Sequence, residues 1–105
     1  MAQSFSAPES ARRRGVANAC VLIPAYNAER TLGAVIDELR RVLPENEIIV
    51  VDDGSTDATR DIARGKPCSL VSIEKNRGKG AALKEGFRYA LSQEFDVALT
   101  VDADG

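Results

Sequence analysis

Residues 47–57 read EIIVVDDGSTD, and this stretch decides the fold. Four consecutive β-branched residues run into two aspartates and a turn, which is the pattern of a short strand buried on both faces. Similar runs occupy residues 19–23, 69–74 and 96–101. The sequence therefore predicts four strands.

Helical patterns separate these runs, because apolar residues recur there at a spacing of three or four. The expected helices are residues 29–43, a short segment between Asp57 and Gly65, and a segment around residues 83–91. Ser55, Thr56 or Asp57 is expected to cap the second of them. The order βαβαβαβ predicts an α/β fold of three layers. Its mostly parallel sheet has right-handed crossovers and strand order 3-2-1-4.

The composition limits the size of the domain and the kinds of partner that it can bind. At 105 residues, of which 44% are hydrophobic, the chain can form one small domain with a core. Its net charge is −2, which argues against a nucleic-acid partner, because such domains carry a basic excess. No apolar run approaches the ~18 residues that cross a bilayer, so a cytoplasmic location is expected. Residues 1–17 are expected to form a flexible arm before a folded unit of residues 18–105.

Cys20 and Cys68 lie in strand-like runs and lack the spacing of a zinc site. In the predicted strand order another strand lies between theirs, which separates them by roughly 9.5 Å or more. A disulfide tolerates at most about 7 Å between Cα atoms. Both are therefore expected to be free thiols.

Polar segments follow three of the predicted strands, namely residues 24–27 (PAYN), 52–55 (DDGS) and 102–104 (DAD). Ligands of open α/β sheets bind at the carboxyl ends of the strands, beside the point where the strand order reverses. These segments therefore predict a ligand site. The first strand lacks the Gly-x-Gly-x-x-Gly turn that nicotinamide and flavin cofactors require, which argues against that class of enzyme.

Asp102 and Asp104 directly follow the fourth strand. Two neighbouring carboxylates repel each other unless a cation neutralises them, and Mg²⁺ or Mn²⁺ prefers such oxygen ligands while leaving positions open for phosphates. A divalent ion there would stabilise the charge of a diphosphate leaving group. The alternative is that an Asp-x-Asp sequence occurs in this loop by chance.

The aspartates after the second strand also have two interpretations. A carboxylate there accepts hydrogen bonds from a ribose or a base, or it shapes the turn. We assign Asp53 to the ligand and Asp52 to the turn. Residues 76–80 (NRGKG) are not a Walker A sequence. The two cationic side chains of this segment, Arg77 and Lys79, either face the phosphates of a ligand or are solvated.

Four blocks together resemble the family 2 glycosyltransferases, which have the GT-A fold. These blocks are VLIPAYN (21–27), EIIVVDDGSTD (47–57), NRGKG (76–80) and DADG (102–105). The resemblance covers residues 18–105 and is strongest to the dolichol-phosphate mannose synthase-like, polyprenyl-phosphate sugar transferases. Many members of that branch have glutamate where this chain has Ala28, and here Glu29 comes one position later.

The resemblance implies a nucleotide-sugar site made of two groups of residues. The first holds the nucleoside, with the tyrosine ring against the base, and comprises Pro24, Tyr26, Val51 and Asp53. The second binds the diphosphate through a divalent metal and comprises Asp102, Ala103 and Asp104, with Mg²⁺ or Mn²⁺ on the two aspartates.

The implied reaction transfers a sugar, with inversion, from a nucleoside-diphosphate sugar to an acceptor, expected to be dolichyl or undecaprenyl phosphate at the membrane. The acceptor phosphate is then the nucleophile, so no catalytic residue is assigned. The chain is expected to hold only the nucleotide-sugar-binding half, ending at the Asp-x-Asp motif, and to be inactive alone. Two alternatives stay open: a non-catalytic nucleotide-binding remnant, and a nucleotidyltransferase, which would want a Gly-x-Gly-x-Arg-type loop after the first strand.

Overall fold

The computed structural model describes residues 18–104, so the arm expected at residues 1–17 lies outside the described residues. Four strands form one sheet: β1 (Ala19–Ala25), β2 (Glu47–Asp53), β3 (Ser69–Ile73) and β4 (Val97–Thr100). Every pairing is parallel and the order is β3-β2-β1-β4. The predicted α/β fold and strand order are confirmed.

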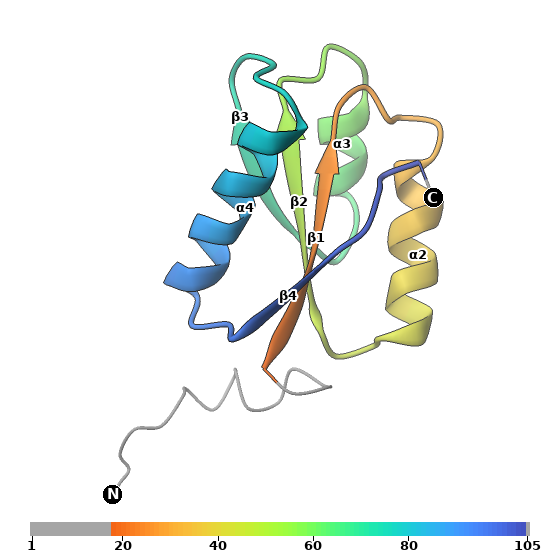
Figure 1. Cartoon of the computed structure of the whole chain (residues 1–105). Coiled ribbons are helices and arrows are strands. Elements are labelled where there is room, and N and C mark those ends of the chain that lie inside the picture. The colour runs from red at the N-terminus through yellow and green to blue at the C-terminus, as the bar shows by residue number, and fades with distance from the viewer. Residues whose placement is uncertain (1–17, 105) are drawn as a thin grey trace, which may run out of the picture.

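In the part of the chain that the structure describes, three helices cover the two faces of this sheet. They are α2 (Leu32–Val42), α3 (Thr59–Arg64) and α4 (Lys79–Ser92). Figure 1 shows α4 on one face and α2 with α3 on the other. Alternate residues of β1 and β2 point to opposite faces, which gives two cores. Val21, Ile23, Ile48 and Val50 pack with α2 and α3, and Cys20, Leu22, Ile49 and Val51 pack with α4.

Two helix starts differ from the prediction. Residues 28–31 form a hydrogen-bonded turn, in which Thr31 N and Leu32 N donate to Ala28 O, so α2 begins at Leu32. The N-cap of α3 is Ala58, with no side-chain hydrogen bond of the capping type. Of the predicted caps, Ser55 and Thr56 instead bond the loop after β1, whereas Asp57 bonds both that loop and the backbone N of Thr59, the first residue of α3.

Neither Cys20 nor Cys68 forms a disulfide, as predicted. Cys20 is fully buried in β1, and Cys68 lies half-buried just before β3, with β2 between the two strands. Burial raises the pKa of the Cys68 thiol, and the negative charge of Glu47 raises it further. A raised pKa lowers the fraction of Cys68 in the thiolate form, which is the reactive form of a cysteine.

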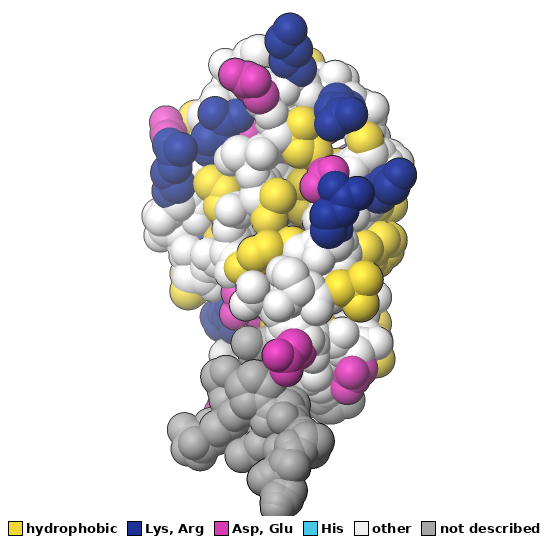
Figure 2. All heavy atoms as spheres, turned by 90° about the vertical axis from the view of Figure 1, so that its left-hand side faces the viewer, with side chains coloured by type: hydrophobic (Ala, Val, Ile, Leu, Met, Phe, Trp, Pro, Cys, Tyr) yellow, Lys and Arg dark blue, Asp and Glu magenta, His cyan; other side chains and the backbone are white. Residues whose placement is uncertain are grey.

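The outer face of α4 and β4 is partly apolar. Phe87, Leu91, Val97 and Leu99 are all at least two-fifths exposed. Figure 2, which views the molecule from the α4 side, shows hydrophobic side chains between charged ones. Within residues 18–104, no helix is long and apolar enough to cross a membrane.

Candidate functional site

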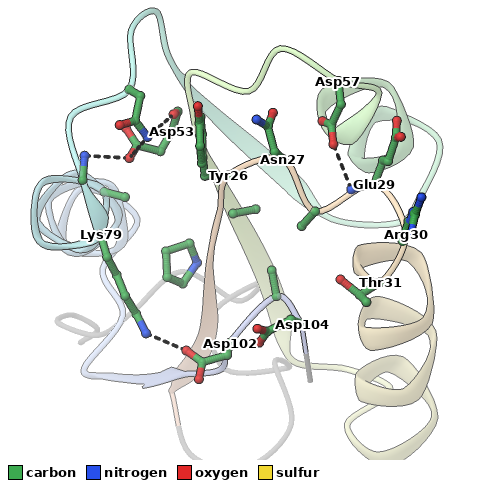
Figure 3. Close-up of a pocket in the computed structure, with 17 residues that line it drawn as sticks. Tyr26, Asn27, Glu29, Arg30, Thr31, Asp53, Asp57, Lys79, Asp102 and Asp104 are labelled. Atoms are coloured by element: carbon green, nitrogen blue, oxygen red, sulfur yellow. Dashed lines mark hydrogen bonds and ion pairs between the residues drawn. The ribbon is translucent and has the colours of Figure 1, made fainter.

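The loops after β1, β2 and β4, together with the start of α4 and the loop before it, line an open pocket of about 750 Å³ at the carboxyl ends of the strands. Figure 3 shows Tyr26 and Asp53 toward one end of this pocket and Asp102 with Asp104 at the other. Six of the seven residues that the sequence predicts for the site line it: Pro24, Tyr26, Asp53, Asp102, Ala103 and Asp104. The fold therefore brings together segments that lie up to eighty positions apart in the sequence.

Val51 is the exception and does not line this pocket. Its side chain is 1% exposed and belongs to the core under α4. A Cβ placed on Gly86 would lie 3.0 Å from Val51 Cγ2, so the helix backbone covers this valine closely. The position of Val51 is that of a core residue beneath the site.

Asp53 lies at the end of β2 and binds the loop before α4. Its Oδ1 accepts a hydrogen bond from Arg77 N at 2.8 Å, and its Oδ2 accepts from Gly78 N at 2.8 Å and Asn76 Nδ2 at 3.0 Å. The residue is 3% exposed. Both carboxylate oxygens are thus engaged within the protein, and the sequence prediction did not include this role.

Asp52 shapes its turn, as expected, and also forms an ion pair. It is fully buried, and its Oδ1 accepts from Ser55 N at 3.3 Å. Its Oδ2 accepts from both Nε and Nη2 of Arg60, at 2.9 and 2.7 Å. A buried carboxylate without a partner is strongly unfavourable, so Arg60 of α3 compensates for the burial of Asp52. This pair joins the start of α3 to the end of β2.

A set of hydrogen bonds ties the loop after β1 to the loop after β2. Asn27, whose φ is 49°, donates from its backbone N to Ser55 Oγ at 2.9 Å. Its Oδ1 accepts from Thr56 N at 2.8 Å. Ala28 N donates to Thr59 Oγ1 at 2.7 Å. These hydrogen bonds fix the backbone directly after Tyr26, which is half-exposed and lines the pocket.

Glu29 and Asp57 complete this connection between the loops. Glu29 N donates to Asp57 Oδ2 at 3.2 Å, and Glu29 Oε1 accepts from Ala58 N at 3.0 Å. Burial alone would raise the pKa of Asp57, but hydrogen bonds from the Thr59 hydroxyl and from Thr59 N and Glu29 N outweigh it and lower the pKa. Its stabilising contribution is therefore complete above the unfolded-state value of 3.8 and is lost as the pH falls through the lower folded-state value.

Asp102 and Asp104 are both exposed in the pocket, and a cation already lies beside one of them. Lys79 Nζ donates to Asp102 Oδ1 at 2.7 Å. That hydrogen bond raises the pKa of Lys79, and the charges of Asp102 and, to a smaller extent, Asp104 add to the effect. The two carboxylates thus create a position that attracts positive charge.

This donor set fits Mg²⁺ or Mn²⁺. Such ions are commonly held by one or two carboxylates, with substrate phosphates and water as the remaining ligands. Among residues 18–104, no group of three histidine, cysteine or acidic side chains is arranged to hold a metal. The ligands beyond Asp102 and Asp104 would therefore come from substrate, water or further protein.

The sequence analysis did not predict the hydrogen bonds that hold the loops in place, although it named Ser55, Thr56 and Asp57 as helix caps and Lys79 as a cation that could face phosphates. The residues that make these bonds are polar and adjacent to the predicted site: Asn27, Glu29, Ser55, Thr56, Asp57, Thr59 and Lys79. Short hydrogen-bonding side chains in two turns that follow neighbouring parallel strands were the available signal. Their partners could not be assigned, because each hydrogen bond crosses between loops 23 to 31 positions apart.

An open parallel sheet of order 3-2-1-4, with a polar pocket where the order reverses, defines the class of α/β domains that bind ligands at the topological switch point. The chain belongs to glycosyl transferase family 2, whose family profile matches residues 20–105. This family membership agrees with the resemblance drawn from the four sequence blocks.

Individual relatives support the same assignment. The chain is 36% identical over 89 residues to an undecaprenyl-phosphate mannosyltransferase of Micrococcus luteus, covering 80% of this chain and 37% of the relative. It is 35% identical over 102 residues to a human dolichyl-phosphate beta-glucosyltransferase, covering 81% and 30%. The chain therefore spans about a third of the length of these relatives.

Solved structures share the fold. Glucosyl-3-phosphoglycerate synthase from Mycobacterium tuberculosis in complex with UDP has a TM-score of 0.69 and 30% identity, over 91% of this chain and 36% of that one. The same enzyme with Mn²⁺, UDP and glucosyl-3-phosphoglycerate has a TM-score of 0.68 and 27% identity, over 95% and 40%. That enzyme carries UDP in both structures, and Mn²⁺ in the second.

Proposed function

We propose that residues 18–105 form the nucleotide-sugar-binding part of an inverting glycosyltransferase. The donor is a nucleoside-diphosphate sugar, the acceptor is a polyprenyl phosphate such as dolichyl or undecaprenyl phosphate, and Asp102 and Asp104 bind Mg²⁺ or Mn²⁺. The enzyme works on the cytoplasmic side of the membrane that carries its acceptor.

One observation carries this proposal: Asp102 and Asp104 line the same pocket as Tyr26 and Asp53. A pocket of about 750 Å³ lies within the range of roughly 300–1,000 Å³ that is usual for small-molecule ligands. The acceptor is taken from the names of the relatives, which transfer mannose or glucose to undecaprenyl or dolichyl phosphate.

Different residues of the pocket would contact different parts of the nucleotide sugar. Tyr26, half-exposed at the β1 end, offers a planar face to the base, and the loop fixed by Asp53 forms the adjacent wall. A bound divalent ion would stabilise negative charge on the departing diphosphate. Asp102 and Asp104 would hold that ion, and Ala103, buried between them, anchors the segment in the core. Rate enhancement would come from positioning and electrostatics, with no general base required of this chain.

Nucleoside diphosphate is expected to bind about tenfold or more tightly with Mn²⁺ than without it, and Asp104→Ala is expected to remove this enhancement. The reason is that the diphosphate and the carboxylate pair repel each other until a cation bridges them. Calorimetric titration of UDP and GDP, each with and without Mn²⁺, measures the effect.

The matched control is Asp61→Asn on α3, which removes an exposed carboxylate outside the pocket and should leave the metal dependence unchanged. Equal affinity of the unaltered chain with and without Mn²⁺ would contradict the metal site. If neither nucleotide bound at millimolar concentration, the result would instead favour the alternative that this domain is a non-catalytic remnant.

The acceptor is tested by transfer of labelled sugar from UDP-glucose or GDP-mannose. The enzyme that contains this segment is expected to move label into undecaprenyl or dolichyl phosphate, recovered by organic extraction, and Asp104→Ala should lower the rate by about 100-fold or more. Label that enters only a water-soluble phosphorylated acceptor would overturn the polyprenyl assignment and leave the nucleotide-sugar assignment intact.

A further inference from the structure

The cation that neutralises Asp102 in this structure belongs to the protein itself. Lys79 is the first residue of α4, and its ammonium crosses the pocket to the segment after β4, 23 positions further along the chain. Figure 3 shows this ion pair beside Asp104. Lys79 therefore occupies a position next to the carboxylates assigned above to the metal.

The backbone of Lys79 is held in place from the opposite side. Asp53 accepts hydrogen bonds from the backbone N–H groups of Arg77 and Gly78, which immediately precede Lys79. Gly78 has a φ of 101°, a left-handed conformation that turns the chain into α4. Asp53 thus holds the backbone directly before Lys79, whereas the Lys79 side chain is exposed to solvent.

The ion pair itself is easily broken. The Lys79 and Asp102 side chains are 63% and 61% exposed, and exposed pairs of this kind contribute little because water screens them. Such a pair lowers the affinity of a competing cation by a modest factor and can be displaced by it. A competing cation can thus replace the Lys79 ammonium beside Asp102.

We propose that Lys79 is a built-in counter-ion that competes with the divalent metal for Asp102 and is released when a diphosphate enters. This inference rests on the proposed nucleotide-sugar site. Without nucleotide, metal binding must displace the ammonium from Asp102. With nucleotide, the diphosphate supplies a second anion for Lys79, so the metal no longer competes with it. Metal and nucleotide consequently favour each other's binding, and the coupling is reciprocal.

Mn²⁺ titration of the nucleotide-free chain, followed by electron paramagnetic resonance of free Mn²⁺, tests the competition. Lys79→Met is expected to bind Mn²⁺ about three- to tenfold more tightly than the unaltered chain, because a competing positive charge has been removed. Lys84→Met is the control. It removes the same charge from an exposed position on α4 outside the pocket and should remain within about twofold of the unaltered chain.

The second measurement is the factor by which Mn²⁺ strengthens UDP or GDP binding, which should be smaller in Lys79→Met than in Lys84→Met. Mn²⁺ binding by Lys79→Met that is no tighter than that by Lys84→Met overturns the inference. Nucleotide titrations without metal report separately on the proposed function. Tighter Mn²⁺ binding by Lys79→Met would support the competition even if neither nucleotide bound. Urea unfolding checks that both variants remain as stable as the unaltered chain.

Discussion

Gly54→Ala is expected to lower the free energy of unfolding by roughly 3–5 kcal/mol, a large part of the stability of a small domain. Gly54 has a φ of +71°, which alanine adopts only with strain. A Cβ at this position would also lie 2.3 Å from Asn76 N and 2.6 Å from Lys75 C. Both atoms belong to the backbone, so no side-chain rotation relieves the clash. Urea unfolding monitored by circular dichroism measures the loss.

Two other glycines separate the causes of this effect. Gly78 also has a positive φ, +101°, but its Cβ would meet nothing within 4 Å, so Gly78→Ala should cost only the backbone strain, about 1–3 kcal/mol. Gly80, in the first turn of α4, has open space and no positive φ, so Gly80→Ala should be neutral or stabilising by about 0.5–1 kcal/mol. Equal losses in Gly54→Ala and Gly78→Ala would contradict the close approach to Asn76.

Asp53→Asn is expected to lower the free energy of unfolding by about 2–4 kcal/mol and to weaken nucleotide binding about tenfold or more, with or without metal. The asparagine has one acceptor oxygen, and its amide group must face either Arg77 N or Gly78 N, both of which are donors. The loop before α4 then loses its attachment to β2. Hydrogen exchange should show faster exchange at the amides of Arg77 and Gly78.

Asp61→Asn serves as the control for this substitution, because its carboxylate is 80% exposed on α3 and should change stability by no more than about 0.5 kcal/mol. A loop-holding role and a ligand-contact role of Asp53 predict different results for Asp53→Asn. If its carboxylate served only as a ligand contact, nucleotide binding would fall while stability and exchange stayed unchanged. That outcome would contradict the loop-holding role.

Apolar periodicity predicted the strands and the helices because burial imposes a period of two on strands and 3.6 on helices. The sequence therefore determined the α/β class and the strand order 3-2-1-4. It also indicated which strand ends carry polar groups. The helix starts were less predictable, since the turn at residues 28–31 and the cap at Ala58 depend on hydrogen bonds made between loops.

Only the tertiary structure decided which partner each polar side chain of the site contacts. The sequence assigned Asp52 to the turn and Asp53 to the ligand, but it did not predict the protein partner of either carboxylate. In the fold one meets Arg60 and the other meets the backbone of residues 77–78. Val51 lies under α4 because of the pleat of β2, and the long side chain of Lys79 reaches across the pocket from the start of α4 to Asp102. Local sequence encodes which groups need partners, and only the packed sheet brings those partners within hydrogen-bonding distance.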